Sequence, residues 1–524
     1  MFRVCGCRTI LIYSFLHLFM SIFFVNFSLL KSTPITRMAI LFDIWKSMPS
    51  LVTILYFLTV VFIAILIILE NRNPVKTISW ILVLVLLPFA GIVFYLFFGQ
   101  EYRKNKMYSR KGLKDLEKLR NLTLEQLDNL PDNQFQIGGR LYSKRHLMNL
   151  LLSNSNAILT NNNEIKILRN GDETFPEIFR AIEQATHHVH LEYYIVEDDK
   201  IGNYLRELLI QKAREGVEVR FIYDDVGSWE LKRKWLKTMS DAGVKVDCFM
   251  RVRYPMLTSK VNYRNHRKIL VVDGDTAFVG GLNFADRYQD GVRGIGPWRD
   301  THLKVIGGGA TALQIIFMAD WYFVSKEILK GDNYFKPFEV GNGKLVQMVA
   351  SGPDSDWESI GQAYFAAIAS ATDYVYISTP YLMPTADIVT ALKTSALGGI
   401  DVRIIVPGLS DAITPKWGTN SYIEELLEAG VKIYFYKAGF THSKVIVVDG
   451  VFSSVGTANL DFRSLETNFE VNAMIYDEET AGILTSHFLD DQDKSEMVVL
   501  EEWIKRPRLN KIKESFARIL SPML

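Results

Sequence analysis

Cysteine is scarce in this chain of 524 residues, which has three: Cys5, Cys7 and Cys248. This count excludes a disulfide framework. No second Cys or His pair stands beside Cys5 and Cys7, so zinc is not indicated. A lipid on these two cysteines is conceivable, but incidental cysteines are the simpler interpretation.

An excess of either charge is also missing, since 59 basic residues balance 58 acidic ones to a net charge of +1. Proteins that bind nucleic acid usually carry a basic excess, so composition gives no support to such a partner. The chain lacks the G-x-x-x-x-G-K-[ST] loop of nucleotide-binding proteins and the H-E-x-x-H metal motif. Sequence therefore indicates neither a cofactor nor a metal.

Two long apolar runs, residues 51–69 and 77–99, contain no charged residue. Each is long enough, as a helix, to cross a hydrocarbon core of roughly 30 Å. The connection, residues 70–76, is short, so we expect a transmembrane hairpin within residues 38–100. Two buried core helices are the alternative, but core helices rarely stay so uniformly apolar.

The flanks of this hairpin predict its orientation. Six basic residues follow it, at Arg103, Lys104, Lys106, Arg110, Lys111 and Lys114. Because such residues concentrate on the cytoplasmic side, we expect a multi-pass protein of the plasma membrane whose remaining domains are cytoplasmic. These cations also attract anionic membrane lipid. The N-terminal extension, residues 1–37, contains an apolar stretch at 9–30 that fits a third span, an interfacial helix or a signal-like segment.

The rest of the chain repeats itself, with four segments recurring in the same order. They are residues 181–191 and 367–377, 216–222 and 399–405, 242–246 and 429–433, and 266–274 and 442–450. Strands that alternate with helices predict an α/β class, and the long period predicts a duplicated domain. We expect a basic linker at 101–134, one domain at 135–335 and a second at 344–490.

The C-terminal tail, residues 491–524, has apolar residues at helical spacing. They are Leu509, Ile512, Phe516, Ile519 and Leu520, with Lys505, Lys511, Lys513 and Arg518 among them. This pattern predicts an amphipathic helix, which either packs on the second domain or rests on the membrane.

Each repeat contains one His-x-Lys-x4-Asp motif. The two copies are His266, Lys268 and Asp273, and His442, Lys444 and Asp449, and we expect all six residues to be catalytic. Phosphodiester transfer needs a nucleophile, an acid for the leaving oxygen and cations for the non-bridging oxygens. A neutral imidazole supplies the first, a protonated imidazole the second and two lysines the third. One motif supplies one histidine, so the duplication supplies the pair.

The remaining histidines carry less weight. His187, His188 and His190 lie where a helix meets a strand, and we interpret them as structural. His302 follows Trp298-Arg299-Asp300 close to the predicted site and is a secondary candidate.

These motifs resemble the phospholipase D superfamily over roughly residues 135–490. The resemblance implies two α/β halves with one active site at their pseudo-twofold interface. Residues that match the family pattern are His266, Lys268, Asp273, Asn283, His442, Lys444, Asp449 and Asn459. Glu470 matches the downstream carboxylate, for which Asp300 is the equivalent in the first half. Thr457 matches a hydroxyl position where the first half has Gly281.

Within that superfamily, the chain from about Met38 is most similar to the bacterial cardiolipin synthase family. Four segments carry the likeness: residues 70–74, 280–283, 296–302 and 516–524. The resemblance implies transfer between two phosphatidylglycerols, giving cardiolipin and glycerol through a phosphohistidine. It also implies that His266 attacks and His442 acts as the acid. Hydrolysis of phosphodiesters and a non-enzymatic membrane scaffold remain alternatives, and the acceptor alcohol stays open.

Overall fold

The computed structural model describes residues 139–252, 262–335 and 343–523, and also residues 57, 59–65, 74–87, 91, 92 and 95. They belong to two compact units, residues 1–100 and 101–524. In the first unit, helix α4 (Pro74–Leu86) buries Leu84, and the rings of Trp80 and Tyr95 meet edge to face at 5.5 Å. Among the described residues, no helix combines the length and apolarity that crossing a membrane requires. The expected spans at 51–69 and 77–99 lie partly outside those residues, and residues 9–30 and 101–134 lie wholly outside them.

One long mixed sheet organises the second unit, with strand order β19-β13-β12-β10-β15-β16-β18-β9-β1-β8-β6-β5-β2-β3-β4. The first half supplies β1 (Leu159–Arg169), β2 (His188–Tyr193), β3 (Glu218–Asp224), β4 (Lys245–Phe249), β5 (Lys268–Val272), β6 (Thr276–Gly280) and β8 (Thr301–Gly307). The second supplies β9 (Lys344–Ser351), β10 (Tyr374–Ser378), β12 (Asp401–Pro407), β13 (Lys432–Tyr436), β15 (Val445–Val448), β16 (Phe452–Gly456), β18 (Glu470–Tyr476) and β19 (Ser495–Met497). Antiparallel pairing of β1 with β9 joins the halves, which repeat the same strand order from that seam outwards.

The sequence pattern explains the central strands. In β5, Lys-Ile-Leu-Val-Val is buried at every position, and so is Val-Ile-Val-Val in β15. A strand covered on both faces reads as a continuous apolar run rather than an alternation. Helices therefore have to cover both faces of the sheet.

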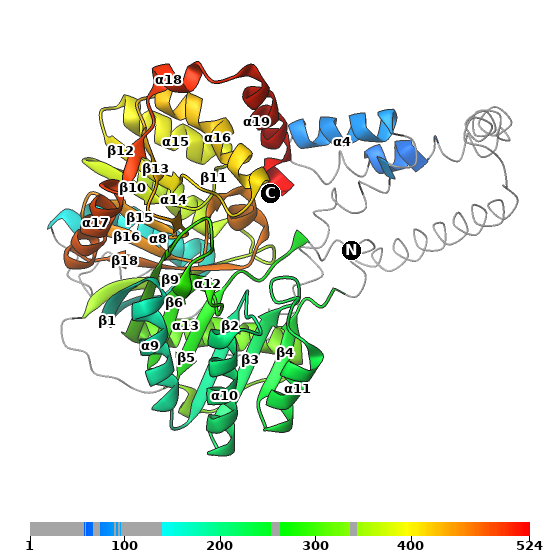
Figure 1. Cartoon of the computed structure of the whole chain (residues 1–524), viewed down its shortest axis with the longest axis vertical. Coiled ribbons are helices and arrows are strands. Elements are labelled where there is room, and N and C mark those ends of the chain that lie inside the picture. Colours follow the sequence, from blue (N-terminus) through cyan, green and yellow to red (C-terminus); the bar gives the residue numbers. More distant parts are fainter. Residues whose placement is uncertain are drawn as a thin grey trace, which may run out of the picture. The chain divides into compact units, whose positions relative to one another are not determined.

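Three apolar cores fill the space between sheet and helices. Helices α9 (Asn170–Glu183), α10 (Lys200–Arg214) and α11 (Arg233–Asp241) cover one face of the first half. Helices α14 (Ser359–Ala369), α15 (Ala386–Leu397) and α16 (Ile413–Glu428) cover the second half in the same way. On the other face, α13 (Gly308–Ser325) and α17 (Glu478–Gln492) share one core that contains strands of both halves. Figure 1 shows the green first half and the yellow-to-red second half joined through this shared region.

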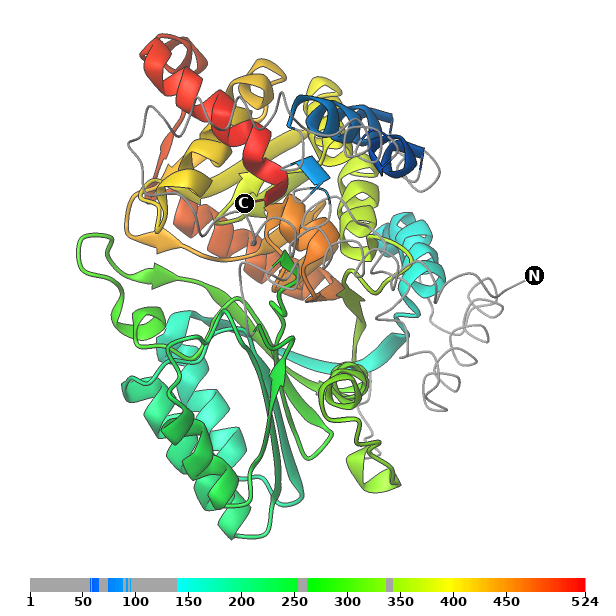
Figure 2. The same cartoon turned by 90° about the vertical axis from the view of Figure 1, so that its right-hand side faces the viewer.

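The chain that precedes β1 packs on the second half. Helix α8 (Arg145–Ser155), preceded by a 3-10 turn at Gly139–Lys144, packs on α14 and β9, and its Leu147, Met148 and Leu151 join the core of the second half. The domain boundary expected at residue 135 stays a prediction; in packing, the chain crosses into its own half only at β1. Figure 2 shows this cyan helix beside the second half.

The tail forms α18 (Leu500–Ile504) and α19 (Arg508–Leu520), followed by a 3-10 turn at Ser521–Met523. The amphipathic helix expected from Leu509 onwards is present as α19. It packs on α16 through a face that contains buried Glu514 and Ala517.

Candidate active site

Short cross-strand pairs bring the two motifs together. In one, β7 (Trp298–Arg299) of the first half pairs in parallel with β14 (Phe440–Thr441) of the second, and the amide of His442 donates to the carbonyl of Arg299 at 2.7 Å. In the other, Asn265 bridges Phe469, and the amide of His266 donates to the carbonyl of Phe469 at 2.9 Å. The backbone of each histidine is thus bonded to the residue that precedes a carboxylate of the opposite half, Asp300 for His442 and Glu470 for His266.

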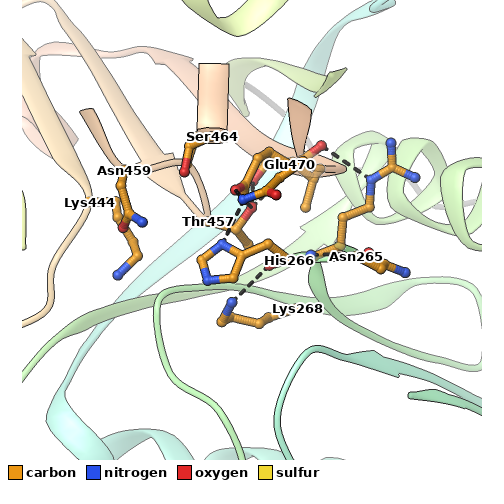
Figure 3. Close-up of polar contacts among 12 residues, drawn as sticks. Asn265, His266, Lys268, Lys444, Thr457, Asn459, Ser464 and Glu470 are labelled. Carbon is orange, nitrogen blue, oxygen red and sulfur yellow. Dashed lines mark hydrogen bonds and ion pairs between the residues drawn. The ribbon is translucent and has the colours of Figure 1, made fainter. Parts of the chain in front are cut away.

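The carboxylates consequently cross between the halves. His266 Nδ1 lies 2.9 Å from Glu470 Oε2, and His442 Nδ1 lies 2.7 Å from Asp300 Oδ2. Both carboxylates are fully buried. A carboxylate on Nδ1 fixes the tautomer and leaves Nε2 for chemistry. The sequence left open which histidine Glu470 serves, and the structure places it on His266 (Figure 3).

Strand register identifies Asp300 as the counterpart of Glu470. Gly280 pairs with His302 across β6 and β8, and Gly456 pairs with Asn472 across β16 and β18. The carboxylates lie two residues before these partners, Asp300 before His302 and Glu470 before Asn472. Asp300 follows Asn283 at a longer spacing than that at which Glu470 follows Asn459, yet the two carboxylates occupy equivalent positions.

The two carboxylate sites are built differently. The Thr457 hydroxyl donates to Glu470 Oε2 at 2.6 Å. In the first half Gly281 stands at the equivalent position, and a Cβ there would lie 2.0 Å from Asp300 Oδ1. The shorter Asp300 carboxylate therefore occupies the space that a threonine side chain would take. Glu470 with Thr457 in one half, and Asp300 with Gly281 in the other, thus fill the same space beside a histidine.

Two buried lysines accompany the histidines. Lys268 Nζ donates to the carbonyl of His266 at 2.8 Å, and Lys444 Nζ donates to that of His442 at 2.5 Å. Burial lowers the pKa of Lys268 to about 7 and that of Lys444 to about 8, although nearby carboxylates oppose the shift. The charge of each lysine acts on both histidines, so the two lysines and the two imidazoles lie around one space. Figure 3 shows Lys268 and Lys444 on two sides of His266.

The histidine–carboxylate pairs differ electrostatically. Burial lowers the pKa of His266 to about 4 despite Glu470, and burial with the two lysines holds the pKa of His442 well below 6.5. Burial raises the pKa of Asp300 to about 6. Burial would raise the pKa of Glu470 too, but His266, Lys268 and Thr457 lower it overall. Glu470 is therefore the more firmly ionised of the two carboxylates.

The aspartates of the two motifs do not reach the histidines. Asp273 lies at the far end of β5 from His266, and the five residues of that strand span about 17 Å. It accepts hydrogen bonds from the amides of Thr186, His187 and His188. Asp449 accepts from Thr372, Asp373 and Tyr374 in the same way, and also pairs with buried Lys144 at 2.9 Å. These two aspartates, expected among the catalytic residues, therefore tie a helix–strand connection to the sheet.

The asparagines are placed close to the motifs but already bonded. Asn283 accepts from the amide of Ile195 and donates to the Tyr288 hydroxyl. Asn459 donates to Asp461 at 3.2 Å, and its carbonyl oxygen has no partner. Figure 3 shows Asn459 beside Lys444, both facing the space in front of His266.

Sequence reasoning missed the aromatic walls and the arginine clasps. Tyr194 contacts the His266 ring at 4.8 Å, and Trp298 lies 5.7 Å from that of His442. Arg267 donates to the Glu470 carbonyl at 3.2 Å, and Arg299 donates to Asp491 at 2.8 Å, so each reaches the opposite half. Arg267 stands between His266 and Lys268, and Trp298 and Arg299 stand next to Asp300, so position along the chain was their signal; Tyr194 had none.

The other histidines stay outside this arrangement. His188 and His190 are buried beside Gln314 and Arg220 at the Asp273 end of β2, in keeping with a structural role. His302 is buried, makes no hydrogen bond through its ring, and has its pKa lowered to about 3 by burial. Within the described residues, no three or more His, Cys, Asp or Glu side chains gather as a metal site.

Two α/β halves that face paired His-Lys motifs across one buried site define a phosphodiester-transferring enzyme of the phospholipase D type. The family model "Cardiolipin synthase, PLD-like domain" matches residues 178–293 and 364–492, and "Phospholipase_D-nuclease N-terminal" matches residues 53–100. A cardiolipin synthase of Halalkalibacterium halodurans is 44% identical over 90% of this chain and 93% of its own. Cardiolipin synthase 2 of Bacillus anthracis is 44% identical over 88% of this chain and 89% of its own.

This chain therefore belongs to the cardiolipin synthase family, whose members are phosphatidyltransferases with phospholipase D-like domains. Among solved structures, the phosphatidylserine synthase of Haemophilus influenzae superposes with a TM-score of 0.55 at 15% identity. It covers 73% of this chain and all of its own, which shows a shared fold.

Proposed function

We propose that this chain transfers a phosphatidyl group between two phosphatidylglycerol molecules, producing cardiolipin and glycerol. The observation that carries the proposal is the crossed arrangement of His266 on Glu470 and His442 on Asp300, with both lysines beside them. The exchange replaces one phosphodiester by another, so it needs no nucleotide.

The chemistry balances with these groups alone. In the first step, His266 Nε2 attacks phosphorus, the bond to the headgroup glycerol oxygen breaks, and His442 gives that oxygen its proton. In the second, His442 takes a proton from the glycerol hydroxyl of another phosphatidylglycerol. That oxygen attacks phosphorus, the P–N bond breaks, and His266 is regenerated.

The assignment of His266 as nucleophile is supported by its carboxylate partner. A phosphohistidine bonded through Nε2 keeps a proton on Nδ1, and ionised Glu470 stabilises that cationic ring. The proton-donating role suits His442, because Asp300, with a pKa raised by burial to about 6, holds charge less firmly. Negative phosphate in the site favours protonation of His442, whose pKa the two lysines lower in its absence.

Lys268 and Lys444 are proposed to hold the non-bridging phosphoryl oxygens. Each lysine stands two residues after its histidine, and its ammonium group donates to the carbonyl of that histidine. They serve the purpose that a metal ion serves in other phosphoryl-transfer enzymes. Asn283 and Asn459 are proposed to shape the phosphate site, and Asp273 and Asp449 to position the strands.

The division of the chain also belongs to this proposal. A membrane hairpin within residues 38–100 would hold the two halves at the cytoplasmic face of the plasma membrane, where anionic lipid is substrate and surface. The N-terminal family match at residues 53–100 supports a discrete module there. The test is a cysteine at position 105 in a chain with Cys5→Ser and Cys7→Ser. An impermeant thiol reagent should not label it in intact cells but should label it after lysis, and labelling in intact cells would reverse the topology.

The reaction itself is tested with purified full-length protein and phosphatidylglycerol as the only lipid. Mass spectrometry should show cardiolipin and an equal amount of glycerol. Phosphatidic acid as the main product would instead identify a hydrolase, and the absence of any product would leave a scaffold.

The histidine roles are tested by trapping. Labelled lipid with a good leaving group should leave a phosphatidyl adduct on His266 in the His442→Ala protein, because such a leaving group needs no acid. His266→Ala should form no adduct. An adduct on His442 in the His266→Ala protein would reverse the roles.

A further inference from the structure

Helix α19 turns an apolar stripe away from the protein. Leu509, Ile512, Phe516 and Ile519 are 61–76% exposed and recur three or four residues apart, on one side of the helix. Glu514 and Ala517, on the opposite side, are the residues buried against α16. A surface helix of a globular protein normally turns its apolar side inward, so this orientation is reversed.

Cations border this stripe. Lys505, Arg508 and Lys513 are exposed and make no ion pair within the described part of the chain. By contrast, Lys511 pairs with Glu424 of α16 at 3.0 Å and Arg518 pairs with Glu425, which fixes the helix on the domain. The chain from 505 to 524 has six basic residues and one acidic residue. An apolar stripe with uncompensated cations beside it is complementary to the surface of an anionic bilayer.

The contacts of α19 run along α16 from Trp417 to Glu425, and the Trp417 end leads towards the active site. Lys513 Nζ lies 5.5 Å from the centre of the Trp417 ring, and Ile413, one helical turn earlier on α16, is also exposed. Just before α16, Asp411 accepts from the Tyr381 hydroxyl at 2.7 Å. The Asp411 charge also acts on the catalytic Lys444. The N-terminal end of α16 is therefore close both to Lys513 of α19 and to the catalytic Lys444.

We propose that the outer face of α19 is a membrane-docking surface that rests on a bilayer containing anionic phospholipid. Leu509, Ile512, Phe516 and Ile519 enter the interface, and Lys505, Arg508 and Lys513 meet lipid phosphates. Docking brings the end of the second half that contains Lys444 close to lipid substrate. This inference rests on the proposed function, because it concerns how a bilayer-resident substrate reaches that site.

The first test compares two forms of one substrate. Ile512→Ser with Phe516→Ser should lower cardiolipin formation from phosphatidylglycerol vesicles at least fivefold. Turnover of short-chain phosphatidylglycerol, dispersed below its critical micelle concentration, should not change. Leu397→Ser is the matched control, since Leu397 is similarly exposed but ends α15 just before β12 begins, whereas α16 follows the other end of β12. Equal rates on vesicles, or equal losses on both substrates, would overturn docking. If the unchanged protein made cardiolipin from neither form, the proposed function would fail instead.

The second test reads position directly. In full-length protein with Cys5→Ser and Cys7→Ser, a dye attached through Phe516→Cys should be quenched by brominated lipid in phosphatidylglycerol vesicles. The same dye attached through Leu397→Cys should not be quenched. Buried Cys248 contributes no labelling. Absence of quenching at 516 refutes the inference. A smaller assembly of the Ile512→Ser, Phe516→Ser protein in detergent would identify a second copy of the chain as the occupant.

Discussion

The Gly281 position offers a sharp test of the crossed carboxylates. Gly281→Thr puts a Cβ 2.0 Å from Asp300 Oδ1 and 2.6 Å from its Cγ. An ordinary contact is roughly 3.4 Å, so the carboxylate has to move by more than about 1 Å. The hydrogen bond to His442 Nδ1, now 2.7 Å, cannot survive such a displacement.

The size of the effect follows from the bond that is lost. A hydrogen bond to a charged group contributes about 1.5–3 kcal/mol. If His442 needs this bond in the transition state, the rate falls roughly 10- to 150-fold. Cardiolipin formation is measured beside thermal unfolding, so that lost activity is separated from lost folding. Gly482→Ala in α17 is the control, because no atom lies within 4 Å of its added Cβ.

Rescue makes the test specific. Asp300→Glu added to Gly281→Thr recreates the arrangement in which Thr457 donates to Glu470. The double variant should recover at least tenfold over Gly281→Thr alone, and Asp300→Glu alone should stay impaired. Native activity in Gly281→Thr, or no recovery in a folded double variant, would refute the reasoning.

Three further predictions concern the motif aspartates, the lysines and metal. Burial would raise the pKa of Asp273, but amide hydrogen bonds hold it at about 2, so its stabilisation is present above about pH 4 and lost as pH falls through 2. Asp273→Asn should cost about 2 kcal/mol, and Asp449→Asn about 3–5 kcal/mol because Lys144 stays buried without its partner. Denaturant unfolding at pH 7 measures both losses of stability. A loss of turnover in protein that is still folded would show a catalytic role for the aspartate. Because protonated Lys268, with a pKa of about 7, is the form that binds phosphate, kcat/KM should fall as pH rises through 7. The fall in kcat should come at higher pH, since bound phosphate raises that pKa, and coincident pH profiles would contradict this. Exhaustive chelation should leave turnover intact, and rescue of a lost activity by one divalent ion would show that the lysines do not suffice.

The sequence predicted the duplicated α/β halves because its matched segments are local. His266 with Lys268, and His442 with Lys444, lie two residues apart, and the strand expected there would put both members of each pair on one face. The tail helix was equally local, since its period is visible in the residues themselves. Such features depend on a few neighbouring positions and survive without knowledge of the fold.

The features that were missed depend on pairing across long sequence distances. Nothing local says that residue 265 bridges residue 469, or that α8 packs on the half that follows it. The spacing of the motif likewise did not show that its aspartate lies at the other end of the strand from its histidine. Asp273 and Asp449 have positive φ values of 51° and 55° in the turns after their strands, at the end away from the histidines.

The crossing of the carboxylates gives the duplication a physical meaning. Each half carries a histidine and a lysine but supplies its carboxylate to the other half, so neither half contains a complete site. Because the backbone bonds at His266 and His442 set that exchange, docking the halves and orienting both imidazoles are one event. The two sites were therefore free to diverge in detail, to Glu with Thr and to Asp with Gly, provided that each pair still filled its space. That divergence supplies the different charge environments that a nucleophile and an acid require.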